Sequence, residues 1–201
     1  MTVDEFNAER RRLLREDVQY REEHERREAE HAERRRLDRI DEQSVLEDLR
    51  AIGVEVRSVW DIYRLPIDQR GAAIPVLLRH LERDHRPNVL EGLASPLANK
   101  IARPWWSDMK RIYLSTDDET ARDRLAAALC TVAVRAHYDD LLSFVPDERL
   151  GGTRTYFLRP INRIDNRMSP GQGRAVVARF ADHPDLGVEA DAVLRGRGIN
   201  D

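Results

Sequence analysis

The segment PWWSDMKRIYLSTDDETARDRLAAALCTVA, residues 104–133, contains two apolar-faced patterns separated by a short polar break. Apolar residues recur in both patterns at spacings of three and four, which is typical of helices that bury one face. Pro104 stands where the first pattern begins, and proline is favoured there because the first turn of a helix needs no backbone donor. The segment therefore predicts a pair of helices.

Similar helix pairs recur before and after this segment, about every 31–36 residues. The chain shows no extended Val/Ile/Thr alternation and no Asn-Gly hairpin signal, so no strand pattern competes. One such pair cannot bury its apolar faces alone, and four of them predict a stacked array. The expected helices are residues 72–83 and 88–98, 104–115 and 119–133, 138–145 and 151–164, and 171–182 and 185–196.

The pattern carried by AIPVLLRHL…NVLEGLASPLA, WSDMKRIYL…RDRLAAALCTVA and GGTRTYFLRPINRI resembles HEAT-like repeat proteins in their short bacterial, armadillo-like form. The resemblance covers about residues 45–198. It implies an all-α fold in which the pairs form an α-α superhelix. It also implies a binding scaffold, since most proteins of this kind bind unrelated partners and a few are enzymes.

Residues 1–43 differ in composition from residues 44–201, and we expect a charged N-terminal helix or arm before the repeat domain. Thr2 and Glu5 have the spacing of a capping box. Phe6, Leu13 and Tyr20 recur every seven residues. They could form a short apolar stripe for a partner, for a second subunit or for the chain's own body. The alternative is a solvated helix supported by many opposite charges at i,i+3 and i,i+4.

Charge and cysteine content limit the classes of function. The formal net charge is −3, whereas a dedicated nucleic-acid binder usually has a basic domain. Cys130 is the only cysteine, so no intrachain disulfide can form, and we expect a small buried side chain in a reducing cytoplasm. The N-terminus lacks the apolar core of a signal peptide, and no apolar stretch is long enough to span a membrane. We therefore expect a cytoplasmic protein that does not enter a membrane.

The stretch DERLGGTRTYFLRPINRI, residues 147–164, could be read as a phosphate-binding loop because of Gly151 and Gly152. A P-loop needs a lysine after its glycines and a strand before them, and neither is present. We therefore expect these glycines to form the hinge between two paired helices.

The same stretch begins a series of arginines that could lie on one helix face. Such a strip could bind an acidic partner or a phosphate backbone. The alternative is a set of ordinary ion pairs with nearby carboxylates. The candidate residues are Arg154, Arg159, Arg163 and Arg167.

The adjacent tryptophans, Trp105 and Trp106, are further candidates for a binding surface. Neighbouring helical residues point about 100° apart, so one ring is expected to pack between repeats while the other is partly exposed. Exposed tryptophan is enriched at binding hot spots and can stack on a base. With Asp108, Lys110 and Arg111, these rings also supply the residue types that HEAT-like DNA alkylpurine glycosylases use.

No motif in the chain indicates a catalytic residue, a metal site or a cofactor. The histidines lack metal-ligand spacing, and no His-Glu-x-x-His motif occurs. We therefore predict a non-enzymatic scaffold or adaptor for protein–protein interaction that binds its partner on the concave face of the HEAT-like array. The alternatives are nucleic-acid binding through the arginine strip and a glycosylase-type enzyme. Oligomeric state is left open, with the N-terminal helix as one possible dimerisation element.

Overall fold

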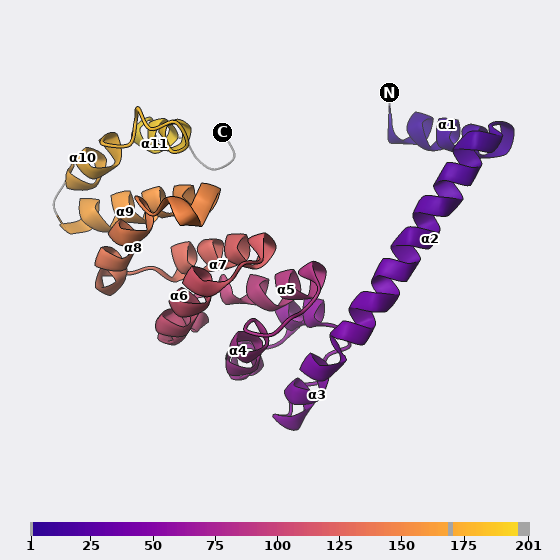
Figure 1. The fold of residues 1–201 in the computed structure, drawn as a ribbon, viewed down its shortest axis with the longest axis horizontal. Helices are drawn as coiled ribbons and strands as arrows, with labels where there is room; N and C mark the ends of the chain where they lie inside the picture. The colour runs from indigo at the N-terminus through magenta and orange to yellow at the C-terminus, as the bar shows by residue number, and fades with distance from the viewer. Residues whose placement is uncertain (1, 169–170, 197–201) are drawn as a thin grey trace. The chain divides into compact units, whose positions relative to one another are not determined.

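The computed structural model describes residues 2–168 and 171–196, and for residues 166–168 it describes the backbone alone. Within these ranges all regular structure is helical and no strand occurs, so the predicted all-α class is confirmed. None of the described helices is both long enough and apolar enough to cross a membrane. The chain divides into two compact units, Met1–Gln43 and Ser44–Asp201, which are described separately (Figure 1).

The first unit contains two helices, α1 (Val3–Glu16) and α2 (Val18–Asp41). The predicted capping box is present, because the Glu5 backbone N–H donates to Thr2 Oγ1 at 3.2 Å and the Thr2 N–H donates to Glu5 Oε2 at 2.7 Å. The charged N-terminal segment is helical but is interrupted once. The helix stops at Asp17, whose extended backbone ends α1 and whose carboxylate accepts from the Tyr20 N–H at 2.9 Å, which caps α2.

The break at Asp17 divides the expected apolar stripe, since Phe6 and Leu13 lie in α1 and Tyr20 lies in α2. Phe6 is exposed, and α1 contains no buried residue. Surface ion pairs of the i,i+3 and i,i+4 kind occur along both helices, for example Arg12 with Glu9 at 2.7 Å. Each such pair adds only about 0.2–0.5 kcal/mol to helix stability.

The second unit contains helices at the positions of the expected pairs, although several of their bounds differ from those expected. Its elements are α3 (Gln43–Ala51), η1 (Val59–Arg64), α4 (Ile67–His80), α5 (Pro87–Ala94), η2 (Ser95–Leu97), η3 (Lys100–Trp105), α6 (Trp106–Ser115), α7 (Glu119–Val132), η4 (Arg135–His137), α8 (Tyr138–Phe144), η5 (Glu148–Phe157), α9 (Leu158–Met168), α10 (Gln172–Ala178) and α11 (Gly187–Leu194), where η marks a 3-10 helix.

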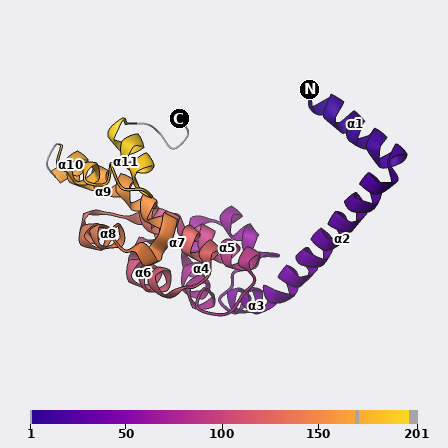
Figure 2. The ribbon, with the colours of Figure 1, turned by 45° about the horizontal axis from the view of Figure 1, so that its top comes forward.

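Contacts in this unit run within each helix pair and from one pair to the next. Helix α4 packs on α5, α6 on α7, α8 on α9, and α10 on α11. The second helices also contact each other in order, α5 with α7, α7 with α9, and α9 with α11. Figures 1 and 2 show the pairs following one another along this unit, from α4 and α5 to α10 and α11. The HEAT-like superhelix itself stays a prediction.

The hinge before α9 differs from the expected boundaries. A helix was expected over residues 151–164, but residues 148–157 form the 3-10 segment η5 and the α-helix begins at Leu158. Gly151 has φ 57° and ψ −142°, a conformation that side chains with a Cβ rarely adopt, so the glycine permits the kink. Pro160 is the third residue of α9, where its missing N–H breaks no hydrogen bond of the helix.

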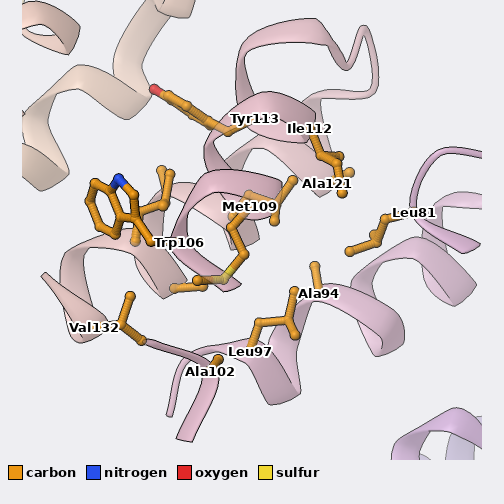
Figure 3. Packing of buried hydrophobic residues seen from close by; sticks show 14 of the residues in the cluster. Leu81, Ala94, Leu97, Ala102, Trp106, Met109, Ile112, Tyr113, Ala121 and Val132 are labelled. Carbon is orange, nitrogen blue, oxygen red and sulfur yellow. The ribbon is translucent and has the colours of Figure 1, made fainter. Parts of the chain in front are cut away.

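One hydrophobic core runs through the second unit, from Val45 in α3 to Val193 in α11. Figure 3 shows part of it, where Met109 and Ile112 of α6 lie among side chains of α5, η2 and α7. Both side chains are almost fully buried. The apolar stripes that predicted the helix pairs therefore face one another in a shared interior.

Candidate functional site

A pocket of about 510 Å³ lies against α7, α9 and α11 and is called the α9 pocket below. Its size falls in the range of ligand pockets, roughly 300–1,000 Å³. Segments far apart in the sequence build it, because the C-terminal half of α7, the first half of α9 and the end of α11 meet there with the start of η3. Its lining residues are Lys100, Cys130, Thr131, Arg159, Pro160, Asn162, Arg163, Val193 and Gly196.

The helical period of α9 separates its core side chains from its pocket side chains. Leu158, Ile161 and Ile164 are buried in the hydrophobic core. Arg159 and Arg163, four residues apart, line the pocket instead. Because residues at i and i+4 share a helix face, the sequence places both guanidinium groups on the side of α9 that does not pack.

Arg159 is held by an acidic residue of the neighbouring helix. Its Nε donates to Glu189 Oε1 of α11 at 2.6 Å, and its Nη2 lies 3.4 Å from Glu189 Oε2. Both side chains are about a quarter exposed. The pair links α9 to α11 and offsets the charge of Arg159.

Arg163 is held by the end of a helix rather than by a carboxylate. Its Nη2 donates to the backbone oxygen of Ala133 at 3.2 Å and lies 3.5 Å from that of Cys130, both at the C-terminus of α7. Arg103 donates to the Val132 oxygen at 3.2 Å. Exposed carbonyls at a helix C-terminus carry partial negative charge and favour a cation. Arg163 is therefore positioned by α7 while it keeps its formal charge.

Lys100 supplies a further cation to the pocket. It is exposed at the first position of η3, and Asn99 caps this segment by accepting from the Ile101 N–H at 3.1 Å. None of the described residues that line the pocket is a carboxylate. The lining therefore combines apolar surface from Pro160 and Val193 with positive charge.

Cys130 lines the same pocket and is partly buried. Burial raises the pKa of its thiol above the ordinary value, although the nearby Arg163 and Arg159 act in the opposite direction. A raised pKa keeps the thiol protonated at neutral pH, and the protonated form is a poor nucleophile. The chemistry of Cys130 therefore gives no support to a catalytic thiol.

Arg154 is separate from the α9 pocket. Its side chain is only 3% exposed, its Nη2 donates to Asp185 at 2.8 Å, and its Nε donates to the Gly151 oxygen at 2.9 Å. These bonds link the hinge in η5 to the turn before α11. Arg154 therefore stabilises the fold rather than lining the pocket. Arg167 lies in the last turn of α9, and its side chain is outside the described part of the chain.

Trp106 is buried where α6 packs against η4 and the start of α8. Its ring stacks on His137 with centroids 3.8 Å apart, and its Nε1 donates to Asp140 at 2.7 Å. Lys110 Nζ also donates to Asp140, at 2.9 Å. Burial alone would raise the pKa of Asp140, but the hydrogen bonds from Lys110 and Trp106 lower it below its ordinary value. Trp106 therefore packs between α6 and the residues at the start of α8, and its ring is not exposed to a partner.

The remaining residues of the glycosylase-like set do not line the α9 pocket. Trp105 is partly buried against the core. Arg111 pairs with Glu82 and lies 3.5 Å from Asp108. Because these charges are already matched by neighbours, the set does not form a basic surface around an exposed aromatic ring.

A second group of polar side chains joins α3 to the end of α4. His80 is fully buried, with its Nε2 2.9 Å from Asp48 Oδ2 and its Nδ1 3.1 Å from His85 Nε2. Arg79 donates to Asp48 at 3.1 Å, and Arg83 Nη1 lies 3.5 Å from His80 Nε2. Within the described ranges no three His, Cys, Asp or Glu residues could hold a metal ion. This group therefore links two helices.

The pKa of His80 predicts a loss of stability in mild acid. Burial lowers it below 6.5, against the opposing effect of Asp48, so the unfolded chain binds this proton more readily than the folded chain. The free energy of unfolding should be highest above pH 6.5 and should fall as the pH drops through the folded pKa. Urea titrations between pH 7.5 and 5 measure this slope.

His80→Gln keeps a donor for Asp48 but removes the titrating ring, so it should flatten the slope. The exposed His31→Gln is the control and should leave the slope unchanged. Equal slopes for the wild type and His80→Gln would contradict the assignment.

Comparisons of the chain with protein-family models, with curated proteins and with solved structures give no match. We therefore take the candidate function from the residues of the α9 pocket and from their chemistry.

Sequence reasoning found Arg159 and Arg163 but missed Lys100 and Val193. Arg159 and Arg163 could be found because their i,i+4 spacing is visible within one helix. Lys100 and Val193 come from distant segments and reach the pocket only through helix stacking. The one available signal for Lys100 is its rarity, since Lys100 and Lys110 are the only lysines among 34 basic residues.

Proposed function

We propose that this protein is a non-enzymatic scaffold that binds a protein partner through the α9 pocket. The observation that carries the proposal is the composition of the pocket, where apolar surface is combined with cations and where none of the described lining residues is a carboxylate. Interfaces that recognise a partner use such a mixture of apolar anchors and charge. We place this binding in the cytoplasm, where a single free cysteine is stable.

The contacts between successive helix pairs support the HEAT-like part of the proposal. The second helices α5, α7, α9 and α11 each contact the next one, which is the pattern expected when pairs stack in sequence. A pocket formed by three consecutive second helices is a natural site for a partner in such an array. The repeat period of the sequence and the position of the pocket thus both favour partner binding along the second helices of the pairs.

The chemistry of the pocket favours binding over catalysis. The thiol of Cys130 has a raised pKa, and no described residue of the lining is a histidine that could act as a base. Nucleophilic catalysis needs an activated nucleophile beside a base. The lining therefore offers groups that hold a ligand rather than groups that transform one.

Capture from a lysate tests the proposed function. The full chain is immobilised and exposed to a lysate of cells that naturally produce it, with and without prior nuclease digestion. We expect a defined protein to be retained in a near-stoichiometric amount in both samples. If no protein is retained, or if retention requires intact nucleic acid, the scaffold proposal is wrong.

The capture includes two charge-reversal variants. Lys100→Glu reverses an exposed charge in the pocket lining, and Arg64→Glu makes the same change in η1, where Arg64 is 84% exposed. We expect Lys100→Glu to reduce the captured protein and Arg64→Glu to leave it unchanged. Equal capture by both variants would place the binding surface outside the α9 pocket.

A further inference from the structure

We infer that the α9 pocket recognises a short acidic peptide segment in which an apolar side chain lies next to a carboxylate. This inference rests on the proposed function and gives the chemical nature of the partner. It is carried by the positions of two cations, Lys100 and Arg163, beside apolar surface.

The two cations differ in how firmly they are held. Arg163 is fixed by the carbonyl oxygens at the end of α7, with Nη2 3.2 Å from the Ala133 oxygen. Lys100 is exposed at the start of η3 and lines the pocket. A fixed planar guanidinium favours a carboxylate with directional hydrogen bonds, while a lysine adds an adaptable point charge. The pair therefore suits an anion that enters from solvent.

The neighbouring lining supplies apolar contact. Val193 of α11 is 6% exposed and Pro160 lies in the first turn of α9, with the protonated thiol of Cys130 between α7 and α9. A carboxylate alone would leave the small exposed part of this surface in water. An adjacent aliphatic or aromatic side chain would cover it, with a gain of about 25 cal/mol for each Å² of apolar area removed from water.

The size and charge of the pocket favour a peptide over a nucleic acid. A volume of about 510 Å³ accommodates a few side chains. Nucleic-acid grooves instead combine a row of cations with aromatic rings for stacking. Arg159 is already paired with Glu189, and the lining residues within the described ranges include no aromatic side chain. Nucleic acid is therefore an outcome of the test rather than the ligand that we propose.

The test is selection from a display library of random heptapeptides on the immobilised full chain. We expect the selected peptides to combine Asp or Glu with an adjacent Leu, Ile, Val or Phe. A synthetic selected peptide should bind about tenfold more tightly than its Gln or Asn counterpart, since a charge-assisted hydrogen bond is stronger than a neutral one. Its affinity should also fall as salt concentration rises.

Variants locate the peptide on the surface. Lys100→Glu should lower the affinity about tenfold, and Arg163→Gln should lower it while the amide still donates to the end of α7. Arg64→Glu should leave the affinity unchanged, and circular dichroism should show that all three variants fold. Selected peptides that lack acidic residues, or acidic peptides that bind Lys100→Glu as tightly as the wild type, would overturn the inference.

Other outcomes separate this inference from the proposed function. If the library yields no enriched peptide while the lysate capture retains a protein that Lys100→Glu loses, the pocket binds a folded surface and the acidic-peptide inference fails alone. If duplex DNA or RNA competes for the pocket more effectively than the acidic peptide, the inference is overturned in favour of nucleic acid.

Discussion

Phe157→Ala is expected to lower the free energy of unfolding of the second unit by about 3–5 kcal/mol. Phe157 is completely buried and packs against two other aromatic rings. Its centroid is 5.6 Å from that of Tyr113 in α6 and 4.9 Å from that of Phe144 in α8. Removal of its ring leaves a cavity where η5 meets two neighbouring helix pairs.

Denaturant titration measures this effect, and the midpoint temperature should fall by about 2–4 °C for each kcal/mol lost. Phe6→Ala removes a ring of equal size from an exposed site in α1 and is the matched control. It should change the free energy of unfolding by less than about 0.5 kcal/mol. Similar losses from both variants would mean that the aromatic cluster does not carry the packing described above.

Gly173→Ala is expected to lower the free energy of unfolding by about 1–3 kcal/mol, because it forces two helix backbones apart. Gly173 is buried at the start of α10. A Cβ built there would lie 2.6 Å from the backbone oxygen of Asn162 and 2.8 Å from its Cα. Since these atoms belong to the backbone of α9, no rotation of a side chain relieves the clash.

Gly71→Ala is the matched control for Gly173→Ala. Gly71 lies inside α4, and a Cβ at this position meets nothing within 4 Å. The substitution should stabilise the protein by about 0.5–1 kcal/mol, because alanine is the better helix former. A loss of stability from Gly71→Ala, or none from Gly173→Ala, would contradict the packing of α10 on α9.

The helix pairs could be predicted because their signals are local. Apolar spacing and the polar break before Glu119 lie within the segment that they specify, and α6 and α7 form there. The expected start at Pro104 is wrong, because Pro104 lies in η3 and α6 begins at Trp106. The break at Asp17 was missed because the pattern of charge pairs continues through it. The cap that Asp17 forms is also a local signal, and it competes with continuation of the helix.

The start of α9 could not be placed from the pattern alone. Apolar residues follow Gly152 at helical spacing, but Gly151 takes a positive φ and the next turns form a 3-10 helix. The interaction of Arg154 with Asp185 holds this turn from 31 residues away. The spacing of apolar residues along one segment cannot reveal a contact with a residue so far away in the sequence.

Only part of the candidate site could be predicted from the sequence. Arg159 and Arg163 were identified as a basic strip, and the structure brings both to one pocket. Arg154 was grouped with them by sequence proximity, but it is buried in a different contact. Lys100 and Val193 belong to the pocket through stacking of α7, α9 and α11, which depends on the whole second unit.

The rate at which Cys130 reacts with a thiol reagent tests most directly whether a protein partner occupies the α9 pocket. Because Cys130 is the only cysteine and lines the pocket, every modified molecule reports on this site. We predict that the captured partner, with its own thiols blocked beforehand, slows the reaction of the wild type and of Arg64→Glu but not that of Lys100→Glu. An unchanged rate when the partner is bound to the wild type would contradict the proposed function of the pocket.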